Sequence, residues 1–384
     1  MKMTGTTRIT GVLVVVAILV MVLGSAGADG PITIATGLNG PQGVMAAADG
    51  SVWAIDTNAV TRVAGDGSKT TMASLPTTPG PEGAPVGGSR LVQFGGLILA
   101  TNGQWDVNEN RQGDPPAGVA AVLKIENGGW STFADMWAYE KANNPDGKQL
   151  DSHPYGMTIG SDGMLYVVDA GANALLKVNP GNGQVAWVAT LPGVPNGSGL
   201  GPPASEPVPT GVVRDADGSF YVSYLPGAPF TPGASKIVRI AADGALSDYA
   251  TALTSTTDLR RGPDGELYAV QFAIFGQQGP APNSGALVRI RPGTSSQVVI
   301  SGLNYPTSVD FNAAGDAILT VGGVGAPGSG AVVKYTKIAT PVPPPPAEVP
   351  EPATIVLFGA GMMGLLGYAR SSRRSRRQRL PIVG

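Results

Sequence analysis

Apolar and polar positions alternate in short runs along the chain, and the clearest example lies between His153 and Val178. An apolar run follows Pro154, the chain turns at residues 162–163, returns through residues 166–169, and leaves along residues 175–178. Short apolar runs joined by an Asp-Gly turn predict an antiparallel β-meander. One such unit cannot bury both of its faces, so we expect neighbouring copies stacked against it.

The same pattern occurs six times, which predicts an all-β six-bladed β-propeller. Each copy except the last is followed by one more strand, and residues 32–38, which precede the first copy, have the form of that missing strand. We therefore expect this N-terminal strand to complete the last blade and close the ring, which removes exposed sheet edges. The copies begin at Pro41, Ser89, His153, Pro209, Thr257 and Pro306.

The long connections are predicted to gather on one face of the propeller. With the strands of each blade lettered a to d from the axis outward, b–c and d–a loops leave on the same side, and the a–b turns are all short. Functional residues commonly lie on loops held by a rigid scaffold, so we expect binding on this face. Within residues 129–152, positions 134–142 predict a helix that packs on the rim. A lid with an aromatic contact surface, formed by Met136, Trp137 and Tyr139, is the alternative. The long b–c loops are 102–118, 225–234 and 272–284, and the long d–a loops are 77–88, 129–152 and 193–208.

Composition agrees with a turn-rich β protein. The 384 residues include 56 Gly and 34 Pro, 42% are apolar, and there is no Cys. The apolar content suffices for a sizeable core. Without Cys, disulfides and thiolate metal sites are excluded.

The N-terminus predicts a signal peptide over residues 1–28. It carries Lys2 and Arg8, an apolar run over residues 12–23, and the small residues Ala26, Gly27 and Ala28. This order is typical of a secretory signal with a small-x-small cleavage site. A retained anchor helix is the alternative.

The C-terminus holds three elements in order. A proline-rich spacer occupies residues 341–348, the motif Pro350-Glu351-Pro352 follows, and an apolar run over residues 355–369 precedes six arginines. The apolar run is short for a transmembrane helix but reaches across a bilayer with flanking groups, and the arginines favour a cytoplasmic end. Residues 349–379 resemble the PEP-CTERM sorting signal. The resemblance implies an exosortase as partner, transient membrane anchoring, removal of the tail, and delivery to a cell-surface or extracellular-matrix component. An ordinary C-terminal anchor is the alternative.

Charge argues against nucleic acid as a partner. Eight of the 25 Lys and Arg residues lie in the two tails, whereas all 27 Asp and Glu residues lie between Asp29 and Glu351. The segment between the tails therefore has ten more negative than positive charges, which repels a phosphate backbone.

The body of the chain resembles the ScyD/ScyE family of predicted secreted propellers over about residues 32–335. The most specific pieces are Asp151-Ser152-His153-Pro154-Tyr155-Gly156 and residues 226–230, Pro-Gly-Ala-Pro-Phe. Further pieces are residues 258–259, 262–265, 302–303 and 306–307. The family implies the propeller fold and secretion but no established chemistry.

Aligning the blades gives two polar rings near the axis. At the start of strand a, Arg90 and Asp258 are the two charged members and belong to opposite blades. We expect them to face the channel and bind a ligand with a polar or carboxylate end, unless each merely pairs with a neighbour and seals the axis. Asp151, His153 and Tyr155 are further candidates for ligand binding, with His153 as a lone base beside Asp151. A loop role for His153 is the alternative.

After strand b, the second ring includes Asp56, Asn102 and Asp169. Oxygen donors from several blades suit Ca²⁺, so these residues are candidate metal ligands. The alternative is that they cap turns by bonding their own backbone.

Two functions remain open. One is a non-catalytic binding or scaffold module at the cell surface or matrix. The other is a Ca²⁺-dependent hydrolase or lactonase-like enzyme with its site in the central channel. The single His excludes mechanisms that need paired histidines, and we find no phosphate loop, Ser-His-Asp set or His/Cys metal spacing. These absences favour the binding module, and no catalytic residue is assigned.

Overall fold

The structure is a computed structural model that describes residues 30–341, apart from 81–83, 109–110, 127 and 200. The signal peptide predicted at 1–28 and the sorting signal with its helix at 349–379 lie outside the described residues. The same holds for the proline-rich spacer after Pro341.

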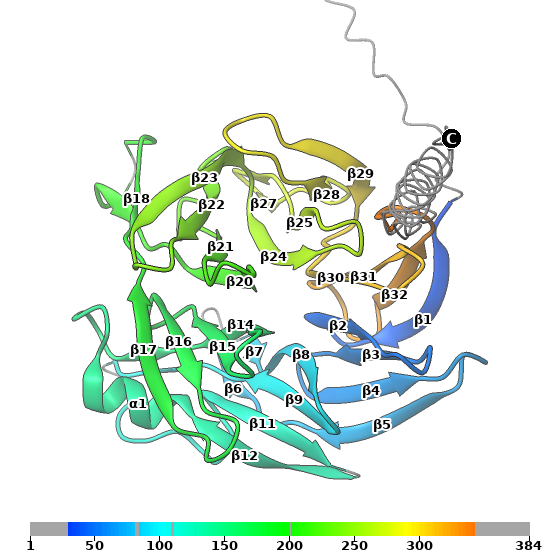
Figure 1. The fold of residues 1–384 in the computed structure, drawn as a ribbon, viewed down its shortest axis with the longest axis horizontal. Helices are drawn as coiled ribbons and strands as arrows, with labels where there is room; N and C mark the ends of the chain where they lie inside the picture. The colour runs from blue at the N-terminus through cyan, green and yellow to red at the C-terminus, as the bar shows by residue number, and fades with distance from the viewer. Residues whose placement is uncertain (1–29, 81–83, 109–110, 127, 200, 342–384) are drawn as a thin grey trace, which may run out of the picture. The chain divides into compact units, whose positions relative to one another are not determined.

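Six four-stranded antiparallel sheets are arranged around a common axis, which confirms the predicted all-β six-bladed propeller (Figure 1). The innermost strands of neighbouring blades contact one another all the way round the ring. The first three blades are β2 (Gly43–Ala46), β3 (Val52–Ile55), β4 (Ala59–Val63), β5 (Lys69–Ser74); β8 (Gly88–Phe94), β9 (Leu97–Asn102), β11 (Ala121–Glu126), β12 (Gly129–Asp135); and β14 (Pro154–Ile159), β15 (Leu165–Asp169), β16 (Ala174–Val178), β17 (Val185–Thr190).

The remaining blades follow the same order from the axis outward. They are β20 (Pro209–Arg214), β21 (Phe220–Tyr224), β22 (Ser235–Ile240), β23 (Leu246–Leu253); β24 (Thr256–Arg261), β25 (Leu267–Gln271), β28 (Gly285–Arg289), β29 (Gln297–Leu303); and β30 (Ser308–Phe311), β31 (Ala317–Val321), β32 (Gly330–Tyr335) with β1 (Ile32–Leu38). In the last sheet β1 pairs antiparallel with β32, so residues from both ends of the described chain share one blade.

The tight a–b turns follow from the Asp-Gly pairs. In the third blade Gly163 has a φ of 74°, which glycine adopts without steric cost, and the Asp162 carboxylate accepts a hydrogen bond from the Met164 amide at 3.2 Å. The apolar strands therefore reverse within a few residues, as the sequence predicts.

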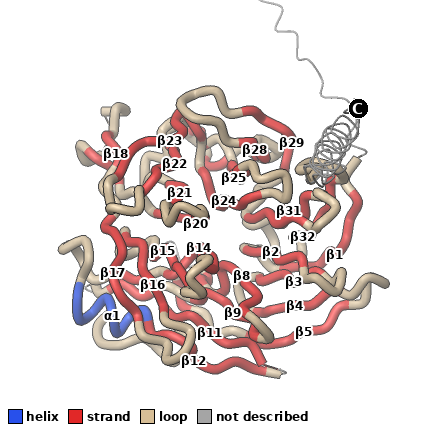
Figure 2. The backbone as a smooth tube through the Cα atoms, viewed as in Figure 1, coloured by secondary structure: helices blue, strands red, loops and turns tan. Residues whose placement is uncertain are grey.

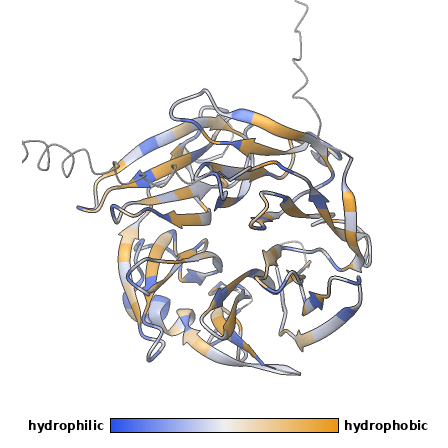
Figure 3. Ribbon diagram, turned by 45° about the vertical axis from the view of Figure 1, so that its right-hand side comes forward, coloured by the Kyte–Doolittle hydropathy of each residue, from blue (hydrophilic) through white to orange (hydrophobic). Residues whose placement is uncertain are grey.

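The hydrophobic core is divided among the six gaps between neighbouring blades. Each gap holds one cluster of buried side chains, and Figure 3 shows the corresponding hydrophobic segments along the strands. In the gap between the last and first blades, Leu38 of β1 packs with Val44 of β2 and Val332 of β32. Burial of this kind contributes about 25 cal/mol per Å² of apolar surface, so every gap stabilises the ring.

Short extra pairs of strands and one helix occupy the b–c and d–a loops (Figure 2). Antiparallel connectivity places all of them on the same side of the propeller, which we call the loop face. They are β6 (Thr78–Pro79) with β7 (Pro85–Val86), β10 (Trp105–Asp106) with β13 (Asp151–Ser152), β18 (Val194–Pro195) with β19 (Ala204–Ser205), β26 (Phe275–Gly276) with β27 (Gly279–Pro280), and α1 (Met136–Asn143).

The helix α1 begins two residues later than the 134–142 range predicted from the sequence. Asp135 caps it by accepting a hydrogen bond from the Ala138 amide. Met136 and Trp137, in its first turn, are buried. The loop predicted at residues 129–152 is wrong in its first part, because residues 129–135 form the outer strand β12. Among the described residues, no helix is long and apolar enough to cross a membrane.

Candidate functional site

Arg90, on the innermost strand β8, fills the axis of the propeller. Its guanidinium donates hydrogen bonds to the carbonyl oxygens of Ser89 and Thr307, both at 2.9 Å, and to those of Gln42 and Thr257. These carbonyls belong to the inner segments of four blades. Arg90 is fully buried, so its side chain ties these blades together from within.

Asp258, on β24, lies against Arg90. Arg90 Nε is 3.4 Å from Asp258 Oδ1, and both side chains are buried. Asp258 also accepts hydrogen bonds from the Ser308 hydroxyl at 2.6 Å and the Val309 amide at 3.1 Å. Burial raises the pKa of Asp258, but the charges of Arg90 and Arg260 and these hydrogen bonds outweigh it, so the net pKa is lowered. The two charges expected to face the channel separately are thus brought together, and they compensate each other.

Tyr155 connects this axial pair to the loop face. The Arg90 guanidinium lies 4.5 Å from the centre of the Tyr155 ring, and the His153 ring meets Tyr155 edge-on at 5.4 Å. Burial, followed by the Arg90 charge, lowers the pKa of His153 to about 4. His153 is therefore neutral at neutral pH, and its buried Nε2 has no hydrogen-bond partner.

Beside His153 a pocket of about 370 Å³ opens on the loop face. We call it the rim pocket. It collects residues from the b–c loops of the second and third blades and from the d–a loops on both sides of the third blade. Its main polar residues are Gln104, Asp146, Lys148, Asp151, His153, Asn173 and Glu206.

Asp151 forms one wall of the rim pocket. Both carboxylate oxygens accept hydrogen bonds from Gln104 Nε2 at 3.1 Å, and a Cβ atom on Gly171 would clash with this carboxylate. Burial is the main cause that raises the pKa of Asp151 to about 7, and the nearby charge of Asp169 adds to it. The sequence predicted His153 as a base beside Asp151. Both residues line this pocket, but the Asp151 carboxylate is hydrogen-bonded to Gln104.

On the opposite wall of the rim pocket, Asn173 forms hydrogen bonds with two carboxylates. Its Nδ2 donates to Asp146 Oδ2 and to Glu206 Oε2, both at 2.8 Å. Lys148 Nζ lies 2.6 Å and 2.9 Å from the two carboxylate oxygens of Glu206, and 4.0 Å from Asp146. Lys148 and Glu206 are exposed, whereas Asn173 is 3% exposed.

Two more carboxyl groups lie close behind the pocket. Burial, followed by the charge of Asp169, raises the pKa of Glu140 on α1 to about 8. Asp169 is fully buried and accepts hydrogen bonds from the Ser152 hydroxyl and the His153 amide, both at 2.6 Å. Burial also raises the pKa of Asp169 despite these bonds. This side of the third blade is therefore rich in carboxyl groups that lack a cationic partner.

The residues expected to bind Ca²⁺ do not form a ligand set. Asp56 accepts hydrogen bonds from the Asn58 and Ala59 amides of its own turn, and Asp169 does the same with Gly171 and Ala172. Asn102 donates to the Pro76 and Gly118 carbonyls. In the described part of the chain, no three His, Cys, Asp or Glu side chains are grouped to hold a metal ion. Asp56 and Asp169 therefore cap turns, which is the alternative given for them, and the binding of Ca²⁺ by these residues stays a prediction.

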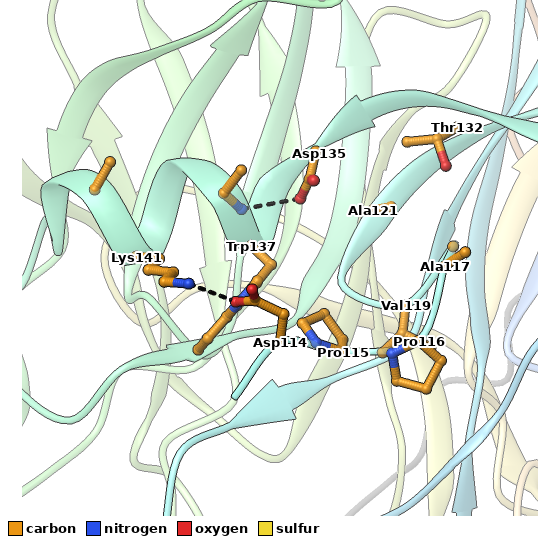
Figure 4. Close-up of a pocket in the computed structure, with 13 residues that line it drawn as sticks. Asp114, Pro115, Pro116, Ala117, Val119, Ala121, Thr132, Asp135, Trp137 and Lys141 are labelled. Carbon is orange, nitrogen blue, oxygen red and sulfur yellow. Dashed lines mark hydrogen bonds and ion pairs between the residues drawn. The ribbon is translucent and has the colours of Figure 1, made fainter. Parts of the chain in front are cut away.

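A hollow of about 720 Å³ lies between α1 and the segment 114–119 (Figure 4). Its lining is mostly proline, alanine and valine. Its charged groups satisfy one another, because Lys141 Nζ is 2.7 Å from Asp114 Oδ1 and Trp137 Nε1 donates to the same oxygen at 2.9 Å. Trp137 is itself buried, so this hollow offers little free polar chemistry.

Comparisons with known proteins agree with the fold and with the C-terminal motif. The family model "PEP-CTERM protein-sorting motif" matches residues 348–374. A gluconolactonase from Xanthomonas campestris is 13% identical over 80% of this chain and 89% of that chain, with a TM-score of 0.52. An oxidoreductase (glucose dehydrogenase) from Thermus thermophilus is 17% identical over 80% of this chain and 100% of that chain, also with a TM-score of 0.52. A comparison with curated protein sequences gives no match.

The molecule is thus a six-bladed β-propeller that carries a PEP-CTERM sorting motif. That motif indicates an exported protein that is transiently anchored in the membrane and processed by an exosortase. The two structural neighbours show the propeller fold alone. The resemblance to the ScyD/ScyE family stays a prediction.

The sequence indicated part of this site. Aligning the blades placed Arg90 and Asp258 near the axis, and the Asp-Ser-His-Pro-Tyr-Gly motif pointed to the wall of the rim pocket. Several residues of the pocket carried no motif, although the loops 129–152 and 193–208 that hold most of them were predicted to lie on the binding face. The missed residues are Gln104, Glu140, Asp146, Lys148, Asn173 and Glu206.

Proposed function

We propose that this protein is an exported propeller that acts as a non-catalytic binding or scaffold module at the cell surface or in the extracellular matrix. It reaches that location through exosortase processing of its C-terminal tail. It binds through the loop face. Kinship with the ScyD/ScyE family is part of this proposal.

The main support for this proposal is that the buried Arg90 and Asp258 side chains occupy the axis of the propeller. The Arg90 guanidinium and the Asp258 carboxylate form an ion pair with each other and hydrogen bonds with strands of the ring. An enzyme with its site in the central channel needs room and free polar groups there for a substrate. The loop face, by contrast, carries extra strands, the rim pocket, and the exposed apolar side chains of Ile274 and Val324. Exposed apolar side chains among polar loops are typical of contact surfaces.

The alternative is a Ca²⁺-dependent hydrolase or lactonase-like enzyme. One structural neighbour is described as a gluconolactonase, but the similarity extends to the fold only. Because Asp56 and Asp169 cap their own turns and the Asn102 Nδ2 atom donates to the Pro76 and Gly118 carbonyls, we expect that neither EDTA nor added Ca²⁺ shifts the thermal unfolding midpoint. A clear Ca²⁺-dependent rise would favour the enzyme and justify an esterase and lactonase screen.

Binding to envelope and matrix fractions of the host tests the main proposal. Ile274→Asp and Val324→Asp place a charge on the loop face, whereas Leu246→Asp makes the same kind of change on the outer strand β23, where Leu246 is also exposed. We expect the first two variants to reduce cosedimentation with these fractions and the third to bind as wild type. Equal binding by all three variants would show that the loop face is not the binding surface.

A further inference from the structure

We propose that the rim pocket binds a small organic cation that carries a primary ammonium group. This inference rests on the proposed binding function and adds the chemistry of its ligand. Three observations support it. The pocket contains polar atoms without a hydrogen-bond partner, its carboxylates outnumber its cations, and its lining argues against other classes of ligand.

The pocket contains buried polar atoms that have no partner. Asn173 is 3% exposed, and because its Nδ2 donates to two carboxylates, the orientation of its amide is fixed. Its Oδ1 atom is then left as an acceptor without a hydrogen bond, and His153 Nε2 is also buried and unpaired. An unpaired buried polar atom costs about 1 to 3 kcal/mol, so a ligand that donates hydrogen bonds here would be favoured.

Negative charge is in excess in the pocket. Asp146, Asp151 and Glu206 face a single cation, Lys148, which is held by both oxygens of Glu206. Asp146 is 4.0 Å from Lys148, at the edge of contact, and Asp151 has no cation within ion-pair distance among the described residues. A ligand with one positive charge and several donors would complement this arrangement.

The lining argues against three other classes of ligand. Anions would be repelled by the excess of carboxylates. A metal ion would need a grouped ligand set, which the described residues lack. Sugars commonly stack on an aromatic ring, and no Trp, Tyr or Phe is among the lining residues. The unpaired acceptor of Asn173 and the surplus carboxylates leave an ammonium group as the chemistry that fits.

Charge coupling adds a second observable. An ammonium group next to Asp151 would favour its ionised form, so affinity should rise as the pH increases through about 7. Other titratable and charged groups surround Asp151 and would modulate this rise. They are Asp106 on β10, Glu140 on α1, Asp146, Lys148 and Glu206 in the loops, His153, and Asp169 at the end of β15.

Isothermal titration of the full chain in detergent tests the inference, with putrescine as the probe. Butanediol is the matched control ligand, because hydroxyl groups replace the amines on a chain of the same length. Asp151→Asn removes the charge and keeps the shape, and Asp114→Asn is the matched control variant in the other hollow. We expect putrescine to bind wild type and Asp114→Asn equally, and Asp151→Asn about tenfold more weakly or worse.

Three results would overturn the inference: no binding of putrescine, equal binding by Asp151→Asn, or equal binding of butanediol. The envelope-binding assay separates this failure from failure of the proposed function. If putrescine does not bind while loop-face binding to envelope fractions persists, the ligand chemistry is wrong and the binding function stands. If both assays fail, the proposed function is wrong as well.

Discussion

Among single residues, Arg90 has the largest expected effect on stability. It is a buried cation whose charge is balanced by Asp258 and whose two terminal nitrogens donate to carbonyls of four blades. Removing it in Arg90→Ala leaves a buried carboxylate without its closest cation and several carbonyls without this donor, so we expect a loss of about 3 to 5 kcal/mol in the free energy of unfolding. Urea unfolding followed by tryptophan fluorescence measures this loss.

Two further variants sharpen the interpretation. Arg90→Lys should restore only part of the stability, because an ammonium group cannot reach carbonyls in a fork as the guanidinium does. Combining Arg90→Ala with Asp258→Asn should cost less than the sum of the single changes, since the second change removes the unpaired charge. Strict additivity of the two changes would contradict a mutual ion pair at the axis.

Asp151 gives a prediction for the pH dependence of stability. Its pKa is raised from 3.8 to about 7 in the folded protein, so the folded state binds the proton more tightly than the unfolded chain does. The stability from this group is full below about pH 4 and is lost as the pH rises through about 7. The loss amounts to at most about 4 kcal/mol. Glu140, whose pKa is raised to about 8, acts in the same direction.

Urea titrations between pH 5 and pH 8 test this directly. Wild type should lose stability as the pH rises within this window, and Asp151→Asn should lose less because it carries no proton to release. The exposed control variant Asp114→Asn should follow the wild-type curve. A wild-type stability that rises toward pH 8 would contradict the burial argument for these two carboxyl groups.

The sequence could predict where in the ring these residues lie, but it could not predict which side chains contact each other. Aligning the blades placed Arg90 and Asp258 near the axis, because the period of the strands fixes which residues begin strand a. Whether two such side chains meet depends on the ring radius and on rotamers, which no alternation pattern encodes. The turn-capping roles of Asp56 and Asp169 were foreseen as an alternative to metal binding, since both follow a strand and precede a tight turn.

On the scale of elements, β1 is the strand whose loss should matter most. It covers the outer edge of β32 and contributes Ala35 and Leu38 to the core between the last and first blades. Deleting residues 30–38 would expose an unpaired edge and open that cluster. We expect a markedly lower thermal midpoint and concentration-dependent aggregation, measured by calorimetry and light scattering.

A deletion of similar kind on the loop face provides the control. Replacing the hairpin β26–β27 with a short glycine linker removes strands that pair only with each other, so the six blades should remain intact. A wild-type melt after deletion of residues 30–38 would mean that β1 contributes little to holding the ring together.

Strands were easier to predict than the pocket they support. Apolar alternation and short glycine-containing turns predicted all six blades, because both follow from local backbone chemistry. Residues 129–152 were predicted as one long loop, whereas residues 129–135 form the outer strand β12 and pair with β11. The rim pocket escaped prediction because Lys148, Asn173 and Glu206 come from three separate loops that only the folded ring brings together.

On the scale of the whole molecule, the propeller fold and the sorting motif are both consistent with an exported binding protein. Residues 30–341 form a ring of six blades with a core in every gap. The matched motif over residues 348–374 indicates export, and under the proposed function the loop face is the contact surface at the destination.

The sorting motif yields the last prediction. If an exosortase recognises Pro350-Glu351-Pro352, then Glu351→Ala should block processing, and the full-length chain should accumulate in the membrane fraction of the host. Immunoblots of membrane and released fractions, with an epitope in the β26–β27 hairpin, would show one longer band in the variant and a shorter released band in wild type. Glu266→Ala, which changes the same residue type inside the propeller, should be processed normally. Release of the Glu351→Ala variant at the wild-type level would mean that a different protease removes the tail. A full-length band held in the membrane for wild type as well would mean that the tail acts as an ordinary anchor.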